Sequence, residues 1–167
     1  SSAASDVYKR QIVAGRPGMG KTAFATNIAF FAAQNCRRQH DDQGVERIVD
    51  GAVVGFFSLE MSAPQLATRI LAEQTGLSTE KIRRGELSKG DFDRIVQASQ
   101  RLHQLPLYID DTPGMTVSAL RTRARRLKRR HNLSMIVIDY LQLIHPNSTS
   151  RRENRVQELS EITLSLI

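Results

Sequence analysis

The chain of 167 residues has few of the features that mark disulfide-linked proteins, metal-binding proteins, membrane proteins and proteins that stack bases on aromatic side chains. Its one cysteine cannot form an intrachain disulfide, and its four scattered histidines show no metal-ligand spacing. Apolar runs such as residues 51–57 fall far short of the roughly 18 residues of a membrane span, and no signal-peptide pattern opens the chain. Aromatic residues are only 5% of the sequence, which argues against a fold that binds single strands by stacking bases. We therefore expect a cytoplasmic protein with no membrane contact.

Positive charge is plentiful but local. The chain has 24 Lys and Arg against 17 Asp and Glu, a net charge of +7, and residues 120–131 alone carry seven cations and no acid. The remainder is neutral, and 40% hydrophobic content is ordinary for a single soluble domain with a real core.

A glycine-rich segment, GRPGMGKT, stands between the apolar residues 12–14 and a helical pattern that begins at Lys21. Glycines let successive backbone N–H groups point at phosphate oxygens, and the following helix adds the positive end of its dipole. Lys21 can reach the β and γ phosphates, and the Thr22 hydroxyl can ligate Mg²⁺. The predicted phosphate-binding loop consists of Gly15, Arg16, Pro17, Gly18, Met19, Gly20, Lys21 and Thr22.

Strands and helices alternate along the sequence, which predicts an α/β fold with a parallel sheet. The predicted strands cover about 12–15, 52–59, 107–110 and 135–144, and the predicted helices about 21–36, 63–74, 88–104 and 116–131. The helix over 88–104 is expected to bury Phe92, Ile95, Val96 and Leu102, and the helix over 116–131 to bury Val117, Leu120, Ala124 and Leu127. Residues 37–51 are expected to form a polar surface loop, and residues 1–11 remain an unassigned tail.

Acidic residues follow three of these strands, at the edge where parallel sheets bind ligands. Asp139 follows an apolar strand in the manner of a Walker B aspartate that holds Mg²⁺. Glu60 ends another strand, and its carboxylate can deprotonate the water that attacks a γ phosphate. Asp110 and Asp111 can make supporting contacts to the same site or stabilise the turn that follows them.

Several motifs together resemble the C-terminal, RecA-like motor domain of the DnaB-type replicative DNA helicases over about residues 12–165. They are GRPGMGKT, FFSLEMS, LYIDDTPG, RARRLKRRH, IVIDYLQLI and RRENRVQELSEI. The resemblance implies a P-loop NTPase with a RecA-like parallel sheet flanked by helices, which binds ATP and Mg²⁺. It assigns Lys21 and Thr22 to phosphate and Mg²⁺, Glu60 to the catalytic base and Asp139 to the metal. It also implies a hexameric ring that moves along single-stranded DNA, unwinds the duplex, and works with primase and a loader.

The chain departs from the family pattern at both ends. Family members have a helical domain before the motor. After the position of Ile167 they continue with further strands, and with a Lys and an Arg that reach into the ATP site of the neighbouring subunit. Residues 12–167 are therefore expected to be a partial motor domain, truncated on its C-terminal side. Consistent with this, the apolar spacing of Val156, Leu159, Ile162 and Leu166 runs on without a helix stop.

Two basic regions are candidates for DNA contact. The resemblance places residues 145–155 in the ring channel, where Arg151, Arg152 and Arg155 would bind phosphates, although a charged loop without that role is the alternative. The basic helix over 116–131 either presents a solvated or subunit-contacting face or touches DNA directly.

Two other functions compete with the helicase motor. One is a P-loop small-molecule kinase in which Glu60 or Asp110 positions an acceptor hydroxyl. The other is a nucleotide-binding interaction module that does not hydrolyse its ligand.

Overall fold

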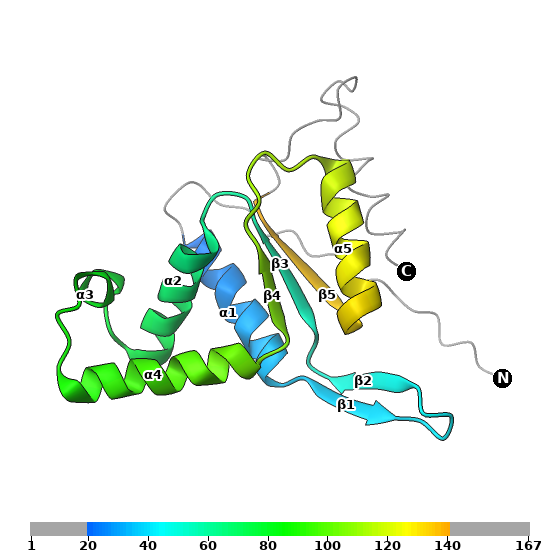
Figure 1. The fold of residues 1–167 in the computed structure, drawn as a ribbon, viewed down its shortest axis with the longest axis horizontal. Helices are drawn as coiled ribbons and strands as arrows, with labels where there is room; N and C mark the ends of the chain where they lie inside the picture. The colour runs from blue at the N-terminus through cyan, green and yellow to red at the C-terminus, as the bar shows by residue number, and fades with distance from the viewer. Residues whose placement is uncertain (1–19, 141–167) are drawn as a thin grey trace.

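Three parallel strands form the centre of the computed structural model, which describes residues 20–140 (Figure 1). The strand order is β4-β3-β5, with β3 at Val54–Ser58, β4 at Leu107–Asp110 and β5 at Met135–Asp139. Val54 pairs with Leu107 on one side and Met135 on the other, so the three strands end at the same edge. The expected parallel α/β sheet is therefore confirmed. The predicted strand at 12–15 lies outside the described residues.

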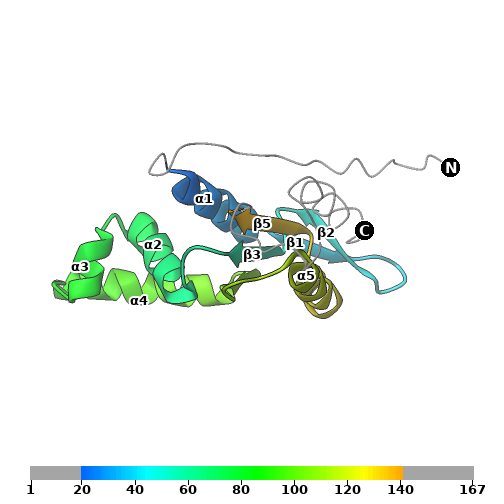
Figure 2. The ribbon, with the colours of Figure 1, turned by 90° about the horizontal axis from the view of Figure 1, so that it is seen from above.

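Helices cover both faces of this sheet (Figures 1 and 2). Helices α1 (Lys21–Gln34) and α2 (Ala63–Thr75) pack on one face, and α5 (Val117–His131) packs on the other. The core under α1 and α2 contains Ala29, Phe30, Ala33, Ala52, Val54, Phe56, Leu66 and Ile70. The core under α5 contains Phe57, Met115, Val117, Leu120 and Ala124, with Leu127 packed against it, as the spacing of α5 predicted.

Strand β3 is buried along its whole length because both of its faces are covered. Phe56 points to α1 and α2, whereas Phe57 points to α5. Gly55 lies on the α5 side, where an added Cβ would stand 3.0 Å from a Leu133 methyl group. A larger residue at this position would push α5 and its following loop off the sheet.

Helix α4 (Lys89–Gln104) begins where predicted, with a capping box of Ser88 and Asp91, but the burial predicted for Phe92 and Val96 was wrong. Phe92 and Val96 are 57% and 37% exposed, Ala98 is buried, and Leu102 packs on the core. The reason is that α4 packs mainly against α2, and its N-terminal half extends beyond the sheet (Figure 1). An amphipathic pattern indicates an apolar stripe but not how much of it is covered.

Residues 37–51 form a β-hairpin rather than the predicted polar loop. Strands β1 (Arg37–His40) and β2 (Glu46–Asp50) pair antiparallel, with an ion pair of 2.9 Å between Arg37 and Asp50. The Asp41 carboxylate accepts hydrogen bonds of 2.9 Å from the backbone N–H of Gln43 and Val45, which fixes the turn. Strand β1 is polar and exposed, and the only apolar residues of β2 are the adjacent Ile48 and Val49, so neither strand shows the apolar alternation that predicts a strand.

Gly51 lies between the hairpin strand β2 and the sheet strand β3, where the chain turns past the end of α1. Its φ of 60° is in the left-handed region, and an added Cβ would lie 2.4 Å from backbone atoms at the end of α1. The next residue, Ala52, donates its N–H to the Ala32 carbonyl at 2.9 Å. Only glycine fits both the backbone angle and this close approach.

The remaining helix starts have clear local causes. Helix α2 has a capping box of Ser62 and Gln65 with proline in its first turn, as predicted, and Thr116 caps α5. The sequence interpretation missed the six-residue helix α3 (Thr79–Arg84), whose start is capped by the Ser78 hydroxyl. Over residues 20–140 no helix is long and apolar enough to span a bilayer.

Candidate functional site

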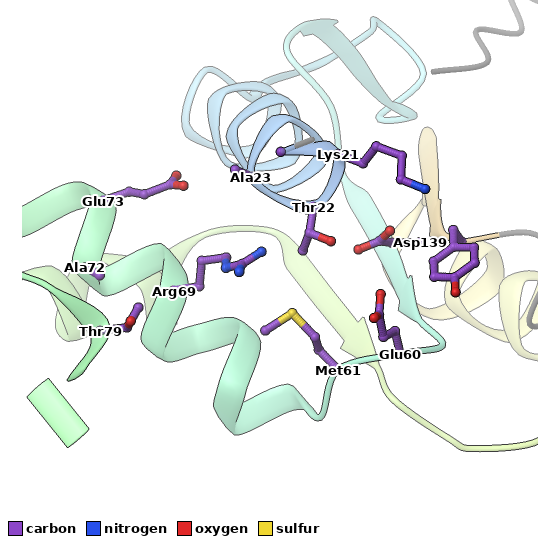
Figure 3. A pocket seen from close by; sticks show the side chains of 12 residues that line it. Lys21, Thr22, Ala23, Glu60, Met61, Arg69, Ala72, Glu73, Thr79 and Asp139 are labelled. Atoms are coloured by element: carbon purple, nitrogen blue, oxygen red, sulfur yellow. The ribbon is translucent and has the colours of Figure 1, made fainter. Parts of the chain in front are cut away.

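The N-terminus of α1 faces the edge at which the strands end (Figure 3). Gly20 stands at the N-cap with φ 78°, provides no side-chain cap, and is followed by a first turn with no acidic residue. The first N–H groups of α1 and its positive dipole end are therefore available to an anion. Lys21 and Thr22 occupy this first turn.

A cavity of about 480 Å³ opens in front of this helix end. It is lined by Gly20, Lys21, Thr22, Ala23, Glu60, Met61, Arg69, Ala72, Glu73, Thr79, Asp139 and Tyr140. These residues come from α1, the turn after β3, α2, α3 and the end of β5. The volume is in the range of small-molecule sites.

The structure brings together four of the residues predicted for the site. Lys21, Thr22, Glu60 and Asp139 line the one cavity, and the carboxylates of Glu60 and Asp139 point into the space beside Thr22 (Figure 3). Residues 15–19 of the predicted loop, and the predicted DNA-contacting Arg151, Arg152 and Arg155, lie outside the described residues.

Sheet register holds the two acids next to each other. Ser58 pairs with Asp139 in the parallel ladder, and the Leu59 N–H donates to the Asp139 carbonyl at 2.8 Å. The Ser58 hydroxyl then donates to the Met61 carbonyl at 2.7 Å, which shapes the turn that carries Glu60. The proximity of Glu60 to Asp139 therefore follows from backbone pairing rather than from a flexible loop.

The surroundings of Asp139 fit a divalent cation. The residue is 4% exposed, and Oδ2 is buried without a hydrogen-bond partner among the described residues. A buried carboxylate oxygen left in this state is costly unless a cation or an ordered water satisfies it. No cluster of three or more His, Cys, Asp or Glu ligands occurs in residues 20–140, so such an ion would need further ligands from phosphate and water. Mg²⁺ accepts this kind of shell.

Lys21 also meets an aromatic residue that the sequence interpretation did not assign. Its Nζ lies 4.8 Å from the centroid of the Tyr140 ring, within the range of a cation–π contact. Because Tyr140 directly follows Asp139, the end of β5 contacts the lysine as well as presenting the carboxylate.

Asp110 and Asp111 do not line the cavity and instead support the turn and helices around β4. Asp110 accepts hydrogen bonds from Thr112 and, at 2.9 Å, from Arg123 of α5. Burial raises the pKa of Asp110, but these hydrogen bonds outweigh it and leave the pKa below its ordinary value. Asp111 accepts from the Ala63 N–H at 2.6 Å, at the start of α2. Asp110 is thus occupied elsewhere and is not placed to position an acceptor hydroxyl.

Two charged residues of the cavity were missed from sequence. Arg69 and Glu73 both come from α2, one helical turn apart. In the sequence there is only a weak indication of them. Their spacing along α2 places both residues on the side of that helix that faces α1, but no motif marks either residue.

Comparison with known proteins gives consistent matches. A family described as the DnaB-like helicase C terminal domain matches residues 7–167. The replicative DNA helicase DnaB of Rickettsia bellii is 46% identical over 157 residues, which are 93% of this chain and 30% of that protein. The replicative DNA helicase DnaB of Geobacillus stearothermophilus is 44% identical over 155 residues, 93% of this chain and 31% of that protein.

A solved structure shares the fold. It is a DnaB-like replicative helicase, described with its interactions with primase, and it has a TM-score of 0.69 and 24% identity, covering 90% of this chain and 35% of that chain. A second solved structure, described as an ATPase domain, has the same TM-score and identity, covering 90% of this chain and 51% of that chain. The chain spans about 30% of the length of the relatives that it matches in sequence.

Proposed function

Because this chain belongs to the family of DnaB-like helicase C-terminal domains, we propose that it is an ATP-binding and ATP-hydrolysing part of a replicative DNA helicase motor. One observation carries the proposal. A single cavity joins the first turn of α1, with Lys21 and Thr22, to the two carboxylates of Glu60 and Asp139. An anion site, a general base and a metal-binding carboxylate at one strand edge are what hydrolysis of a phosphoanhydride requires.

Each residue has a distinct task in this proposal. The amides of the loop and of the α1 N-terminus bind phosphate oxygens, and the Lys21 ammonium neutralises negative charge on the β and γ phosphates. Glu60 orients a water and accepts its proton. Thr22 and Asp139 would hold Mg²⁺, which when bound supplies charge neutralisation for the departing phosphate.

The wider function follows the same family membership. We propose that hydrolysis drives movement along single-stranded DNA, that the motor acts as a hexameric ring in the cytoplasm, and that primase and a loader are partners. Support for a primase partner comes from the structural neighbour described with primase interactions. Arg151, Arg152 and Arg155 are the proposed DNA contacts, because clustered arginines bind phosphates without regard to sequence.

The proposal is tested by ATP hydrolysis in the protein expressed from its complete open reading frame. Hydrolysis by the wild type should rise when single-stranded DNA is added. Lys21→Ala should abolish both hydrolysis and duplex unwinding, because no other side chain from the first turn of α1 carries a positive charge to the phosphates. Arg83→Ala on α3 is the control, since that side chain is 77% exposed and is outside the cavity. Turnover retained in Lys21→Ala would contradict the proposal.

A further inference from the structure

Glu60 stands on a short connection, residues 59–61, between the end of β3 and the start of α2. On the β3 side this connection is fixed, because the Leu59 N–H donates to the Asp139 carbonyl at 2.8 Å. The position of the Glu60 carboxylate also depends on where α2 begins, because the helix starts soon afterwards, at Ala63. A contact that fixes the start of α2 therefore affects Glu60 as well.

Asp111 makes such a contact. Its Oδ2 accepts a hydrogen bond of 2.6 Å from the N–H of Ala63, the first residue of α2. The hydroxyl of the N-cap Ser62 accepts from the N–H of Gln65, so it does not satisfy the Ala63 N–H. The Asp111 carboxylate also lies at the positive end of the α2 dipole. The loop after β4 and the first turn of α2 are thus joined by a bond between residues 48 positions apart.

Asp111 is held in place by its neighbours. The Asp110 carboxylate accepts hydrogen bonds from the Thr112 N–H at 3.1 Å and from the Thr112 hydroxyl at 2.7 Å, which fixes the backbone on both sides of Asp111. Asp110 also accepts from Arg123 of α5 at 2.9 Å. The two adjacent acids therefore attach the end of β4 to helices on opposite faces of the sheet, Asp110 to α5 and Asp111 to α2.

The body of α2 is anchored independently of Asp111. Leu66 and Ile70 are 0% and 3% exposed and pack in the core under α1 and α2. Loss of the Asp111 hydrogen bond should therefore loosen the first turn of α2 and the connection before it, and leave the rest of the helix in place. Glu60 is the charged residue of the cavity that lies in this connection.

We propose that Asp111 is a positioning residue for ATP hydrolysis, which acts by holding the Glu60 carboxylate at the attacking water. This inference rests on the proposed function, in which Glu60 accepts the proton of that water. Asp111 does not line the cavity, so its effect reaches the reaction through Glu60 rather than through contact with the nucleotide. A general base acts only within hydrogen-bond reach of the proton that it takes, so a small displacement of Glu60 lowers the rate without weakening nucleotide binding.

The first test measures single-turnover ATP hydrolysis and the Kd of a non-hydrolysable ATP analogue, each with Mg²⁺, in the protein expressed from its complete open reading frame. Asp111→Ala should lower the hydrolysis rate about ten- to hundredfold and change the Kd less than about twofold. Asp111→Asn keeps an oxygen that can accept from the Ala63 N–H, so its rate should stay within about threefold of the wild type. Asp42→Ala, in the exposed turn of the hairpin, is the matched control and should change neither quantity.

The second test adds Asp111→Ala to Glu60→Gln and shows whether Asp111 acts through Glu60. Because the base is already absent, the double variant should hydrolyse ATP within about twofold of Glu60→Gln alone. A further loss as large as in the wild-type background would overturn the proposal. A wild-type rate in Asp111→Ala, even with a lower melting temperature, would overturn it, as would an equal loss of rate in Asp111→Ala and Asp111→Asn.

These outcomes are distinct from a failure of the proposed function. If Glu60→Gln hydrolyses ATP at the wild-type rate, Glu60 is not the base, and the proposed mechanism fails together with this inference. If Glu60→Gln loses hydrolysis while Asp111→Ala keeps it, only the positioning role of Asp111 is refuted.

Discussion

At the scale of single residues, the site depends on where two carboxylates are placed. Asp139 is buried with one oxygen unsatisfied among the described residues, whereas Glu60 stands on a turn at the mouth of the same cavity. The buried carboxylate is suited to a fixed cation, and the accessible one is suited to exchange a proton with water. The different surroundings of these two acids support the two different roles that we propose for them.

Glu60→Gln should separate binding from chemistry. Glutamine keeps the size of the side chain but cannot accept a proton from water, so hydrolysis should fall about 10²- to 10⁴-fold. The Kd of an ATP analogue should stay within about twofold of the wild type, since Glu60 is not among the residues proposed to bind the phosphates. Equilibrium binding and single-turnover hydrolysis on the same preparation measure both quantities. Loss of nucleotide binding in this variant would show that Glu60 supports the structure instead.

Part of the cavity lining was predictable from sequence at this scale, namely Gly20, Lys21, Thr22, Glu60 and Asp139. Glycines, a lysine and a threonine between a strand and a helix mark a phosphate site locally, and Glu60 and Asp139 each stand at a strand end. Arg69, Glu73 and Tyr140 could not be found in this way. Their place in the cavity depends on the angle at which α2 crosses α1 and on the path of the chain after β5, which no local pattern encodes.

At the scale of elements, an ion pair joins β4 to α5. Arg123 of α5 donates to the Asp110 carboxylate at 2.9 Å, and the two side chains are 42% and 19% exposed. The basic helix is therefore attached to the sheet by a polar contact on its flank as well as by its apolar stripe. The ion pair engages one cation of α5, Arg123. The exposed cations of α5 are the candidates for DNA contact that the sequence indicated.

Asp110→Asn should lower stability in a pH-dependent way. The pKa of Asp110 is lowered in the folded chain, so its charged form stabilises the fold above the unfolded value of 3.8, and this contribution is lost as pH falls through the folded pKa. At pH 7 the variant should lose roughly 1 kcal/mol of unfolding free energy, the scale of a partly exposed charged hydrogen bond.

Urea unfolding of the 167-residue chain, followed by circular dichroism at several pH values, measures the effect. The difference between wild type and Asp110→Asn should shrink steadily below pH 3.8. Asp42→Asn in the exposed hairpin turn is the control and should show little difference at any pH. A difference that grows as the pH falls would contradict this account of the ion pair.

The elements differed in how well the sequence predicted them. Helices with a capping box, such as α2 and α4, begin where expected because the cap is a local hydrogen-bond pattern. The hairpin of β1 and β2 was missed because its stability comes from cross-strand ion pairs and a turn rather than from a buried face. Burial on α4 was misjudged because it depends on how far the helix projects past its neighbours.

At the scale of the whole molecule, the parallel sheet explains why residues distant in sequence meet. Strands β3, β4 and β5 all end at one edge, and the ladder from Ser58 to Asp139 places two of those ends side by side. The N-terminus of α1 faces the same edge, so the residues proposed to bind phosphate, to hold the metal and to accept a proton line one cavity. This arrangement follows from right-handed parallel topology, and it was the part of the fold that the alternating pattern predicted best.

The most direct test of this account is an experimental structure of the complete open reading frame with Mg²⁺ and a non-hydrolysable ATP analogue. We expect the phosphates on the first turn of α1, with Lys21 at hydrogen-bond distance of the terminal phosphate and Thr22 and Asp139 beside the metal. A nucleotide bound elsewhere, or a terminal phosphate far from Lys21 and Glu60, would contradict the central claim that this cavity hydrolyses ATP.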